Sequence, residues 1–531
     1  MLRVWNISGL WWLLPLALAL AGCDSGVRRA DLVVLNGTEP ESLDPAIITG
    51  QPEMRLVSSL FEGLTALDSE ARVIPGMAER WEISPDGRRY VFHLRRGARW
   101  SNGDAVTAMD FVRSWQRTLA PSTAAPYAYQ LYCLENAQAY NEGKLRDFGQ
   151  VGVGAPDDLT LEVRLRNPTP FFLDLCAFVT LMPVHLASIE RCGEDWVKPG
   201  RLVCNGPFML EEWKINHRVR LRANPFYWAR DRVRLGTVDM LPTSQAATAF
   251  NLYSVGAADV ILDKGLIPTI LLADLRGRPD FHASSFLATY FYRVNVTRRH
   301  LANPRVRRAL GMAIDKRRLV ERITRAGELP AGSFVPPGIP GYEPPSGLPF
   351  DPGEARRLLA EAGYPDGKGY PPLVLLFNKS ELNEQMATEI QDMLRRGLGV
   401  RVELKQQEWK VYLNTMDKLD YDLCRSSWVG DYMDPNTFLD LFVTGGGNNR
   451  TGWSDPEYDR LIQDASREAA RDKRRALLLR AEKLLCEEQL PIIPLYHNVG
   501  IQFYDAARVG GIKPNLLDMH PLQFIHRLDR P

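Results

Sequence analysis

Few side chains in this sequence are spaced for catalysis or metal binding. The eight histidines are scattered, and none lies three or four residues from another, the spacing that places two metal ligands on one helix face. The sequence has no Gly-x-Ser-x-Gly elbow, His-Glu-x-x-His motif, P-loop or Gly-x-Gly-x-x-Gly turn. Asp431 and Asp434 are paired carboxylates, but Asp434-Pro435 is also a common turn or helix-start signal. We therefore expect no enzyme, no metal site and no cofactor.

The first 22 residues have the composition of an export signal. Arg3 is positively charged, Leu10 to Ala21 is almost continuously apolar, and small residues lead into Cys23. The apolar run is about a dozen residues, short of the roughly 20 that a membrane-spanning helix needs, and Pro15 interrupts it. We expect residues 1–22 to be removed and no transmembrane anchor to remain.

A lipid anchor is expected instead. Leu20-Ala21-Gly22-Cys23 resembles the lipobox of bacterial lipoproteins, in which the cysteine becomes the lipid-modified N-terminus. Acyl chains enter a bilayer at about 0.8 kcal/mol per buried methylene, so an acylated Cys23 would hold the protein at a membrane surface in the periplasm. Asp24 favours the inner membrane, as in enteric bacteria. The alternative is an ordinary signal peptide with an incidental cysteine.

The rest of the chain has the composition of a globular protein. Its roughly 500 residues are too many for one hydrophobic core, since domains commonly have about 100 to 200 residues. The 65 basic residues balance 64 acidic ones, which argues against nucleic acid as the main partner.

Six cysteines besides Cys23 would enter an oxidising compartment, where disulfides persist. We expect a disulfide between Cys192 and Cys204, which flank a segment with glycine and proline. A weaker candidate pair is Cys133 with Cys176, and sequence alone does not settle the connectivity.

Strand and helix signals alternate along the chain. Apolar and polar residues alternate at 161–165, 219–221 and 400–404, as in half-buried strands. Helices are expected after Thr107, Asp351 and Asp455, where a capping residue precedes apolar residues at helical spacing. The sequence therefore predicts a mixed α/β fold.

Ordered segments carry a resemblance to a known family. They are Asn36-Gly37-Thr38-Glu39, Ser42-Leu43-Asp44-Pro45, Leu60-Phe61-Glu62-Gly63-Leu64, Trp100-Ser101-Asn102-Gly103, Asn205-Gly206-Pro207-Phe208, Asn224-Pro225-Phe226-Tyr227-Trp228, Leu358 to Tyr364 and Trp453-Ser454-Asp455-Pro456. From about residue 31 onward the chain resembles the oligopeptide- and dipeptide-binding proteins of bacterial ABC importers, the family 5 extracellular solute-binding proteins.

The resemblance implies a two-lobed clamshell, the type II periplasmic-binding-protein fold with an additional inserted domain. Lobe I would comprise residues 31–61, 187–286 and 499–531, the inserted domain residues 62–186, and lobe II residues 287–498. Ligand would be enclosed when the lobes close. A monomer of this kind would bind short peptides and deliver them to the permease subunits of an importer.

The resemblance also assigns ligand contacts. Asp431, in Arg425-Ser426-Ser427-Trp428-Val429-Gly430-Asp431-Tyr432, stands where the oligopeptide binders place the carboxylate that receives the ligand's ammonium group. Arg425 matches a basic cleft residue that can face the ligand's carboxylate. The alternatives are a turn-capping Asp431 that faces water and an Arg425 in a structural ion pair.

Aromatic and backbone contacts are expected around this carboxylate. Tyr127, Trp409 and Trp428 match aromatic positions of the family's cleft, where a ring offers a broad apolar face and one polar edge; each could instead be core. Near Gly50 and Gln51 the family runs an extended segment beside the peptide, pairing main chain with main chain.

Two departures from the best-known oligopeptide binder bear on cargo and stability. Asn383 stands where that relative has a histidine that serves peptide carboxylates, which leaves the preferred peptide length open. The relative's disulfide falls on Leu287 and Val429 here, so Cys192 and Cys204 would be this branch's own cross-link.

Other functions on the same scaffold remain open at this stage. The cargo could be cell-wall peptides, a nickel chelate, haem or an opine-like molecule, although Asp431 argues for a ligand with a free ammonium group. A peptide-sensing lipoprotein would have the same sequence features. A hydrolase would need a nucleophile, a base and an oxyanion site, and no motif supplies them.

Overall fold

A computed structural model describes residues 29–528, and the fold is mixed α/β as the sequence predicts. The expected strands appear as β7 (Thr160–Arg164), β9 (Arg218–Ala223) and β15 (Val402–Gln407). The expected helices appear as α2 (Ala108–Leu119), α10 (Pro352–Glu361) and α14 (Pro456–Arg467). The predicted signal peptide, Cys23 and Asp24 lie outside the described residues.

Local capping contacts explain where these helices begin. The Thr107 backbone N–H donates to Asp110 Oδ2 at 2.7 Å at the start of α2. Asp351 Oδ1 accepts the Glu354 N–H at 2.9 Å, and Asp455 Oδ1 accepts the N–H groups of the first turn of α14. Each contact satisfies backbone donors that a helix leaves unpaired at its first turn, so the sequence sets these boundaries locally.

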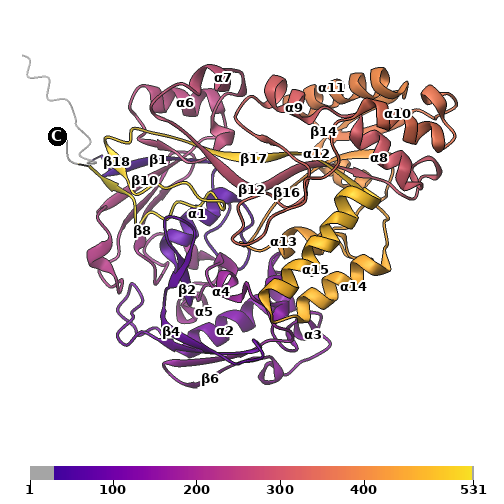
Figure 1. The fold of residues 1–531 in the computed structure, drawn as a ribbon. Helices are drawn as coiled ribbons and strands as arrows, with labels where there is room; N and C mark the ends of the chain where they lie inside the picture. Colours follow the sequence, from indigo (N-terminus) through magenta and orange to yellow (C-terminus); the bar gives the residue numbers. More distant parts are fainter. Residues whose placement is uncertain (1–28, 529–531) are drawn as a thin grey trace, which may run out of the picture.

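A large mixed sheet runs across the upper part of the molecule as drawn in Figure 1. Its strand order is β15, β14 (Leu373–Asn378), β16 (Leu423–Val429), β12 (Phe281–Val294), β17 (Ile492–Tyr504), β11 (Val260–Ile261), β1 (Leu32–Gly37), β10 (Thr237–Pro242), β9 and β8 (Phe208–Lys214), with β13 (Leu329–Pro330) also paired to β17. β12 and β17 are long and antiparallel, and their pairing shifts register between Ser285 and Thr289. These two strands therefore join the N-terminal and the C-terminal parts of the sheet.

Smaller sheets lie apart from the large one. The first is antiparallel, in the order β4 (Ala78–Ile83), β5 (Arg89–Leu94), β7 and β6 (Val153–Asp157). Two further pairs are β2 (Thr65–Leu67) with β3 (Val73–Pro75) and β18 (Val509–Gly510) with β19 (His526–Arg527). The four-stranded sheet falls within the segment where we expect the inserted domain, whose boundaries stay a prediction.

Residues 29–528 contain twelve further α-helices. They are α1 (Gln51–Leu60), α3 (Ala137–Asn141), α4 (Phe172–Leu175), α5 (Leu186–Cys192), α6 (Ala246–Ser254), α7 (Leu272–Leu275), α8 (Pro304–Met312), α9 (Lys316–Leu319), α11 (Glu381–Leu398), α12 (Trp409–Asp417), α13 (Asn436–Leu439) and α15 (Arg471–Lys483). Within residues 29–528, no helix has the length and apolar character that a membrane span requires.

The apolar core divides into several clusters rather than one. The first is built from residues 32–262 and 504–525, while the second and third are built from residues 287–496. Tyr432 belongs to the first cluster although its sequence neighbours do not, and it stacks on Phe171 with ring centroids 4.1 Å apart. This contact ties the chain after β16 to the N-terminal part of the molecule.

The predicted disulfide between Cys192 and Cys204 is wrong in this structure, because all six described cysteines are free. Cys204 points into the first core cluster, where its thiol donates to the Phe208 carbonyl at 3.3 Å and burial raises its pKa to about 12. Cys192 ends α5 and is half-buried. The alternative pair, Cys133 and Cys176, is also unlinked.

Candidate ligand-binding site

Four of the sequence-predicted ligand residues line one pocket of about 330 Å³: Gln51, Tyr127, Trp428 and Asp431. Its walls come from the start of α1, from residues 127–129, from the end of β16 and from residues 517–522. Segments far apart in the sequence therefore converge here. A pocket of this size and position can enclose the end of a small elongated ligand.

Asp431 is placed in the pocket by the chain that follows β16. Gly430 packs so closely on Leu287 that an added Cβ would lie 2.6 Å from its side chain, and the Gly430 N–H donates to the Leu287 carbonyl at 2.7 Å. The Asp431 N–H donates to Thr437 Oγ1 at 3.0 Å. A side chain at position 430 would push this turn away, so the glycine fixes where the carboxylate lies.

The Asp431 carboxylate is mostly, though not fully, withdrawn from water, and it lacks a cation. Gln130 Nε2 donates to Asp431 Oδ2 at 3.2 Å, and no lysine or arginine in residues 29–528 forms an ion pair with it. Burial raises the pKa of Asp431 to about 6, although hydrogen bonds from Gln130 and Tyr129 act in the opposite direction. Desolvating a carboxylate without a counter-charge is unfavourable, so this site favours a cationic ligand group.

Aromatic rings form the wall beside this carboxylate. Tyr127 meets Phe178 edge to face at 5.3 Å, and burial raises the pKa of the Tyr127 hydroxyl to about 12. Trp428 Nε1 donates to the Thr437 carbonyl at 2.7 Å, which orients the indole. These rings supply apolar faces for a ligand, and the polar edge of Trp428 is already fixed.

A second hollow of about 870 Å³ lies on the other side of Asp431. Tyr129, Trp428 and Asp431 line both hollows. Asp434 lies nearby but is not available as an acid or base, because Arg474 holds it in two hydrogen bonds of 2.7 and 2.8 Å. The paired carboxylates of the sequence therefore have separate roles, one free in the pocket and one in a buried ion pair.

The profile of the bacterial extracellular solute-binding proteins, family 5, matches residues 72–450. The chain belongs to this family. Its solved relatives have the type II clamshell fold, which confirms the fold class predicted from the sequence.

Several curated relatives are named for peptide binding, whereas YgiS of Escherichia coli K12, 35% identical with 87% of each chain covered, is named a probable deoxycholate-binding periplasmic protein. The periplasmic murein peptide-binding protein MppA of Escherichia coli K12 is 38% identical in sequence, with 88% of each chain covered. The E. coli MppA structure superposes with a TM-score of 0.80 at 35% identity and covers 94% of this chain and 99% of that one. The periplasmic oligopeptide-binding protein OppA of Salmonella typhimurium LT2 is 36% identical over 91% of this chain and 90% of its own. OppA of Haemophilus influenzae in complex with RPPGFSPFR has a TM-score of 0.78 at 31% identity, covering 94% of this chain and 99% of that one.

The other predicted ligand residues of this family 5 protein lie outside the pocket. Arg425 stacks its guanidinium on the Tyr290 ring, 4.8 Å from the centroid, and Asn383 Oδ1 accepts the Tyr290 hydroxyl at 2.9 Å. Trp409 is 54% exposed and stacks on Tyr412, whose hydroxyl donates to the Arg425 carbonyl. These side chains form a second group, which we call the distal cluster: Arg425, Asn383, Tyr290, Tyr412 and Trp409.

Gly50 precedes the pocket but does not line it. It is the residue before α1, and its Cα faces the Glu53 carboxylate so closely that a Cβ would lie 2.2 Å from Glu53 Oε2. Gln51 reaches the pocket through its position at the first turn of α1. The main-chain pairing expected near these two residues stays a prediction.

Some pocket residues are not predicted from the sequence. Tyr129 and Gln130 contact Asp431 from the segment after Tyr127, and residues 517–522 form another wall. Tyr127 and Tyr129 lie at the start of a 3-10 helix (Ala128–Cys133), with ring centroids 5.8 Å apart, so the alternation typical of a strand does not reveal Tyr129. Nothing in the composition of residues 517–522 marks them as pocket residues.

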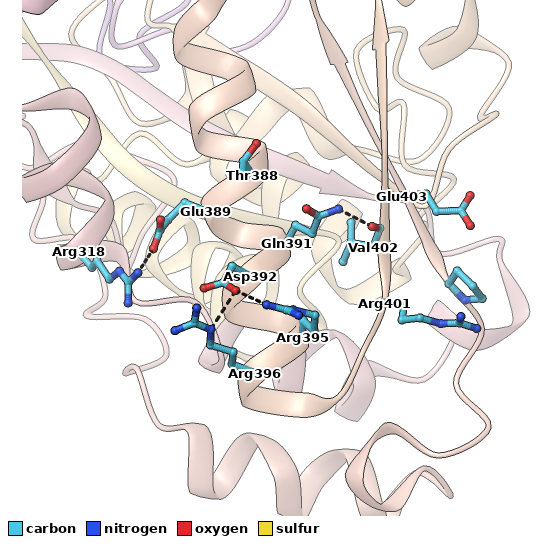
Figure 2. A pocket seen from close by; sticks show the side chains of 11 residues that line it. Arg318, Thr388, Glu389, Gln391, Asp392, Arg395, Arg396, Arg401, Val402 and Glu403 are labelled. Carbon is cyan, nitrogen blue, oxygen red and sulfur yellow. Dashed lines mark hydrogen bonds and ion pairs between the residues drawn. The ribbon is translucent and has the colours of Figure 1, made fainter.

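A separate surface pocket of about 680 Å³ lies between α11 and β15 (Figure 2). Five of its seven charged side chains are paired with one another: Arg318 with Glu389 at 2.5 Å, and Arg395 and Arg396 with Asp392 at 2.9 Å each. None of the predicted ligand residues lines it. Because most of its charges already have partners and none of the predicted ligand residues lies in it, we assign the ligand to the pocket around Asp431.

Proposed function

We propose that this protein captures short peptides between two lobes and delivers them to the permease of an ABC importer. The observation that carries the proposal is the mostly buried Asp431 carboxylate, which lies in a pocket with aromatic walls and has no cationic partner in the described chain. A peptide's ammonium group supplies that missing charge. The peptide cargoes of MppA and OppA, both similar to this chain over most of its length, support the same reading.

We propose the lobe boundaries given by the family resemblance, with lobe I at 31–61, 187–286 and 499–531, the inserted domain at 62–186 and lobe II at 287–498. The long strands β12 and β17 then cross between the lobes, and the pocket lies between all three parts. A ligand that touches both lobes favours the closed state by its differential affinity for the two states. The permease can thereby distinguish loaded from empty protein.

The proposal includes export and a lipid anchor. Cys23 would carry acyl chains after removal of residues 1–22, and Asp24 would favour the inner membrane. An importer at that membrane would receive its ligand from a protein tethered beside it. Mass spectrometry of the mature protein tests the anchor by the mass of the acylated N-terminal residue.

A second cargo is murein peptides, which the name of MppA specifies for a relative of 38% identity. These peptides also present a free ammonium group in some forms, so the Asp431 pocket would serve both cargoes. A nickel chelate or haem fits less well, because neither presents an ammonium group to the Asp431 carboxylate; an opine-like ligand has a secondary ammonium group and stays an alternative. A sensing role would use the same pocket.

The deciding experiment combines copurified-ligand mass spectrometry with calorimetry. Protein isolated from its host is expected to carry short peptides, and Asp431→Asn is expected to weaken peptide binding about 100-fold, because a charge-assisted hydrogen bond is lost. Asp464→Asn, an exposed site on α14, is the matched control and is expected to bind like wild type. Unchanged affinity in Asp431→Asn would refute the site, and a copurified ligand without an amine would refute the peptide cargo.

A further inference from the structure

A second carboxylate, Asp518, lines the same pocket as Asp431. It lies on the C-terminal segment and packs directly on Gly500 of β17, where an added Cβ would lie 2.5 Å from Asp518 Oδ1. Because Gly500 has no side chain, the Asp518 carboxylate can lie directly against β17. Its side chain is 16% exposed, so it is largely withdrawn from water.

Only one of the two Asp518 oxygens is occupied within the described chain. Oδ1 accepts hydrogen bonds from Gln502 Nε2 at 2.5 Å and from His520 Nε2 at 3.1 Å. Oδ2 accepts none among residues 29–528. Because a carboxylate can only accept, His520 Nε2 carries the hydrogen in this contact. The carboxylate is thus fixed in orientation while one of its oxygens is left for another donor.

His520 gives an independent sign that this wall of the pocket is incomplete without a ligand. Its side chain is 1% exposed and lines the pocket, and its Nδ1 is buried without a hydrogen-bond partner in the described residues. Buried polar atoms in native proteins nearly always have a partner. With Nε2 donating to Asp518, Nδ1 of the neutral ring is an acceptor, so it too calls for a donor.

The charge balance of the pocket points in the same direction. Asp431 and Asp518 are its carboxylates, and the arginine that lines it, Arg55, is already bound to Asp263 at 2.9 Å and to the Asn36 carbonyl at 2.9 Å. No lysine or arginine of the described chain therefore neutralises the pocket. A ligand with one ammonium group compensates Asp431 and leaves Asp518 uncompensated.

We propose that Asp518, held by Gln502 and His520, is a subsite that selects a lysine- or arginine-type side chain near the amino end of the bound peptide. This inference rests on the proposed peptide cargo and narrows it to peptides with a cationic side chain. The neighbouring Met54, Leu517 and Leu522 also line the pocket and suit the methylene stem of such a side chain, whose charged end would reach Asp518 Oδ2.

The test is calorimetry with tripeptides that differ only in one side chain. Lys-Ala-Ala and Ala-Lys-Ala are compared with the same peptides carrying norleucine, which has a similar stem without the charge, and with Ala-Ala-Ala. Wild type is expected to prefer lysine over norleucine about tenfold at one of the two positions, as a charge-assisted hydrogen bond would give. Asp518→Asn is expected to reduce this ratio to within about twofold, whatever its effect on the affinity for Ala-Ala-Ala.

The matched control is Asp505→Asn, whose carboxylate is paired with Arg508 at 3.3 Å outside this pocket and whose lysine preference is expected to equal that of wild type. A wild-type ratio near one at both positions would overturn the subsite without any variant being needed. A ratio that survives in Asp518→Asn would overturn it as well. Failure of the proposed function looks different, because wild type would then bind none of these tripeptides.

Discussion

Gln130 Nε2 donates to Asp431 Oδ2 at 3.2 Å across 301 residues of sequence. This amide belongs to the segment where we propose the inserted domain, and the carboxylate belongs to proposed lobe II. The hydrogen bond lowers the pKa of Asp431 but does not offset the desolvation that raises it to about 6. The Gln130 amide thus stabilises the ionised Asp431 carboxylate only in part, and a cationic group of the ligand would stabilise it further.

Peptide affinity is expected to fall at acid pH because Asp431 must be ionised to bind an ammonium group. The free protein has an Asp431 pKa of about 6, and a bound cation lowers that pKa. Affinity should therefore be nearly constant around pH 7 and drop about tenfold per pH unit below 6, with proton release on binding near pH 6. Calorimetry from pH 4.5 to 7.5, in two buffers of different ionisation enthalpy, measures both effects.

Two variants distinguish protonation of Asp431 from unfolding of the protein at acid pH. Asp431→Asn should bind weakly with a flat pH profile. Gln130→Leu should shift the fall in affinity to higher pH, because the lost hydrogen bond no longer lowers the Asp431 pKa. A flat profile in wild type would mean that Asp431 does not receive the ligand's charge.

Local features of the fold are predictable from the sequence because short-range contacts determine them. Thr107, Asp351 and Asp455 precede helices in the sequence, and the structure places helix starts directly after them. Alternating residues likewise mark β7 and β9. Asp431 and Trp428 are found together because Trp428 lies near the end of β16 and Asp431 comes directly after that strand, in a run of residues that carries the family resemblance.

Long-range features are not predictable in the same way. Gln130, Asp518 and His520 reach the pocket from distant segments, and only the folded chain shows that they converge there. The expected disulfide fails for a related reason. The spacing of Cys192 and Cys204 suggests a loop closed by a cross-link, but spacing does not show that Cys204 faces the core and bonds to the Phe208 carbonyl.

Asp434 is expected to be essential for stability rather than for binding. Its ion pair with Arg474 is buried, with side-chain exposures of 12% and 6%. Asp434→Ala would leave a buried guanidinium uncompensated and should lower the free energy of unfolding by about 3 kcal/mol or more. Urea denaturation at pH 7.5 measures this loss, and the double variant with Arg474→Met should recover part of it. Equal stability of Asp434→Ala and wild type would contradict the assignment.

Asp431→Asn should change stability in the opposite direction. Its folded pKa of about 6 lies above the ordinary value of 3.8, so ionisation of Asp431 costs the native state stability at every pH above that range. The amide variant should therefore be more stable than wild type at pH 7.5, by about 1 to 3 kcal/mol. The difference should vanish below about pH 4, where the carboxyl group is protonated in both the folded and the unfolded chain.

Arg425 is expected to recognise the carboxylate of longer peptides. Its guanidinium has no ion pair with an aspartate or glutamate of the described chain, and its Nε is buried without a hydrogen-bond partner. Wild type should bind free-acid peptides about tenfold tighter than their C-terminal amides once the peptide is long enough to reach from Asp431 to Arg425. In Arg425→Met this ratio should fall to near one, as calorimetry with di- to pentapeptides would show.

Trp409 provides the length control for that experiment. It lies in the distal cluster, and its exposed ring is connected to Arg425 only through Tyr412, so it is positioned to contact the far end of a ligand. Trp409→Ala should therefore weaken binding of the longest peptides and leave dipeptide affinity unchanged. If dipeptides lose affinity equally, the distal cluster acts on the pocket through the fold, and the free-acid preference of Arg425 would need another explanation.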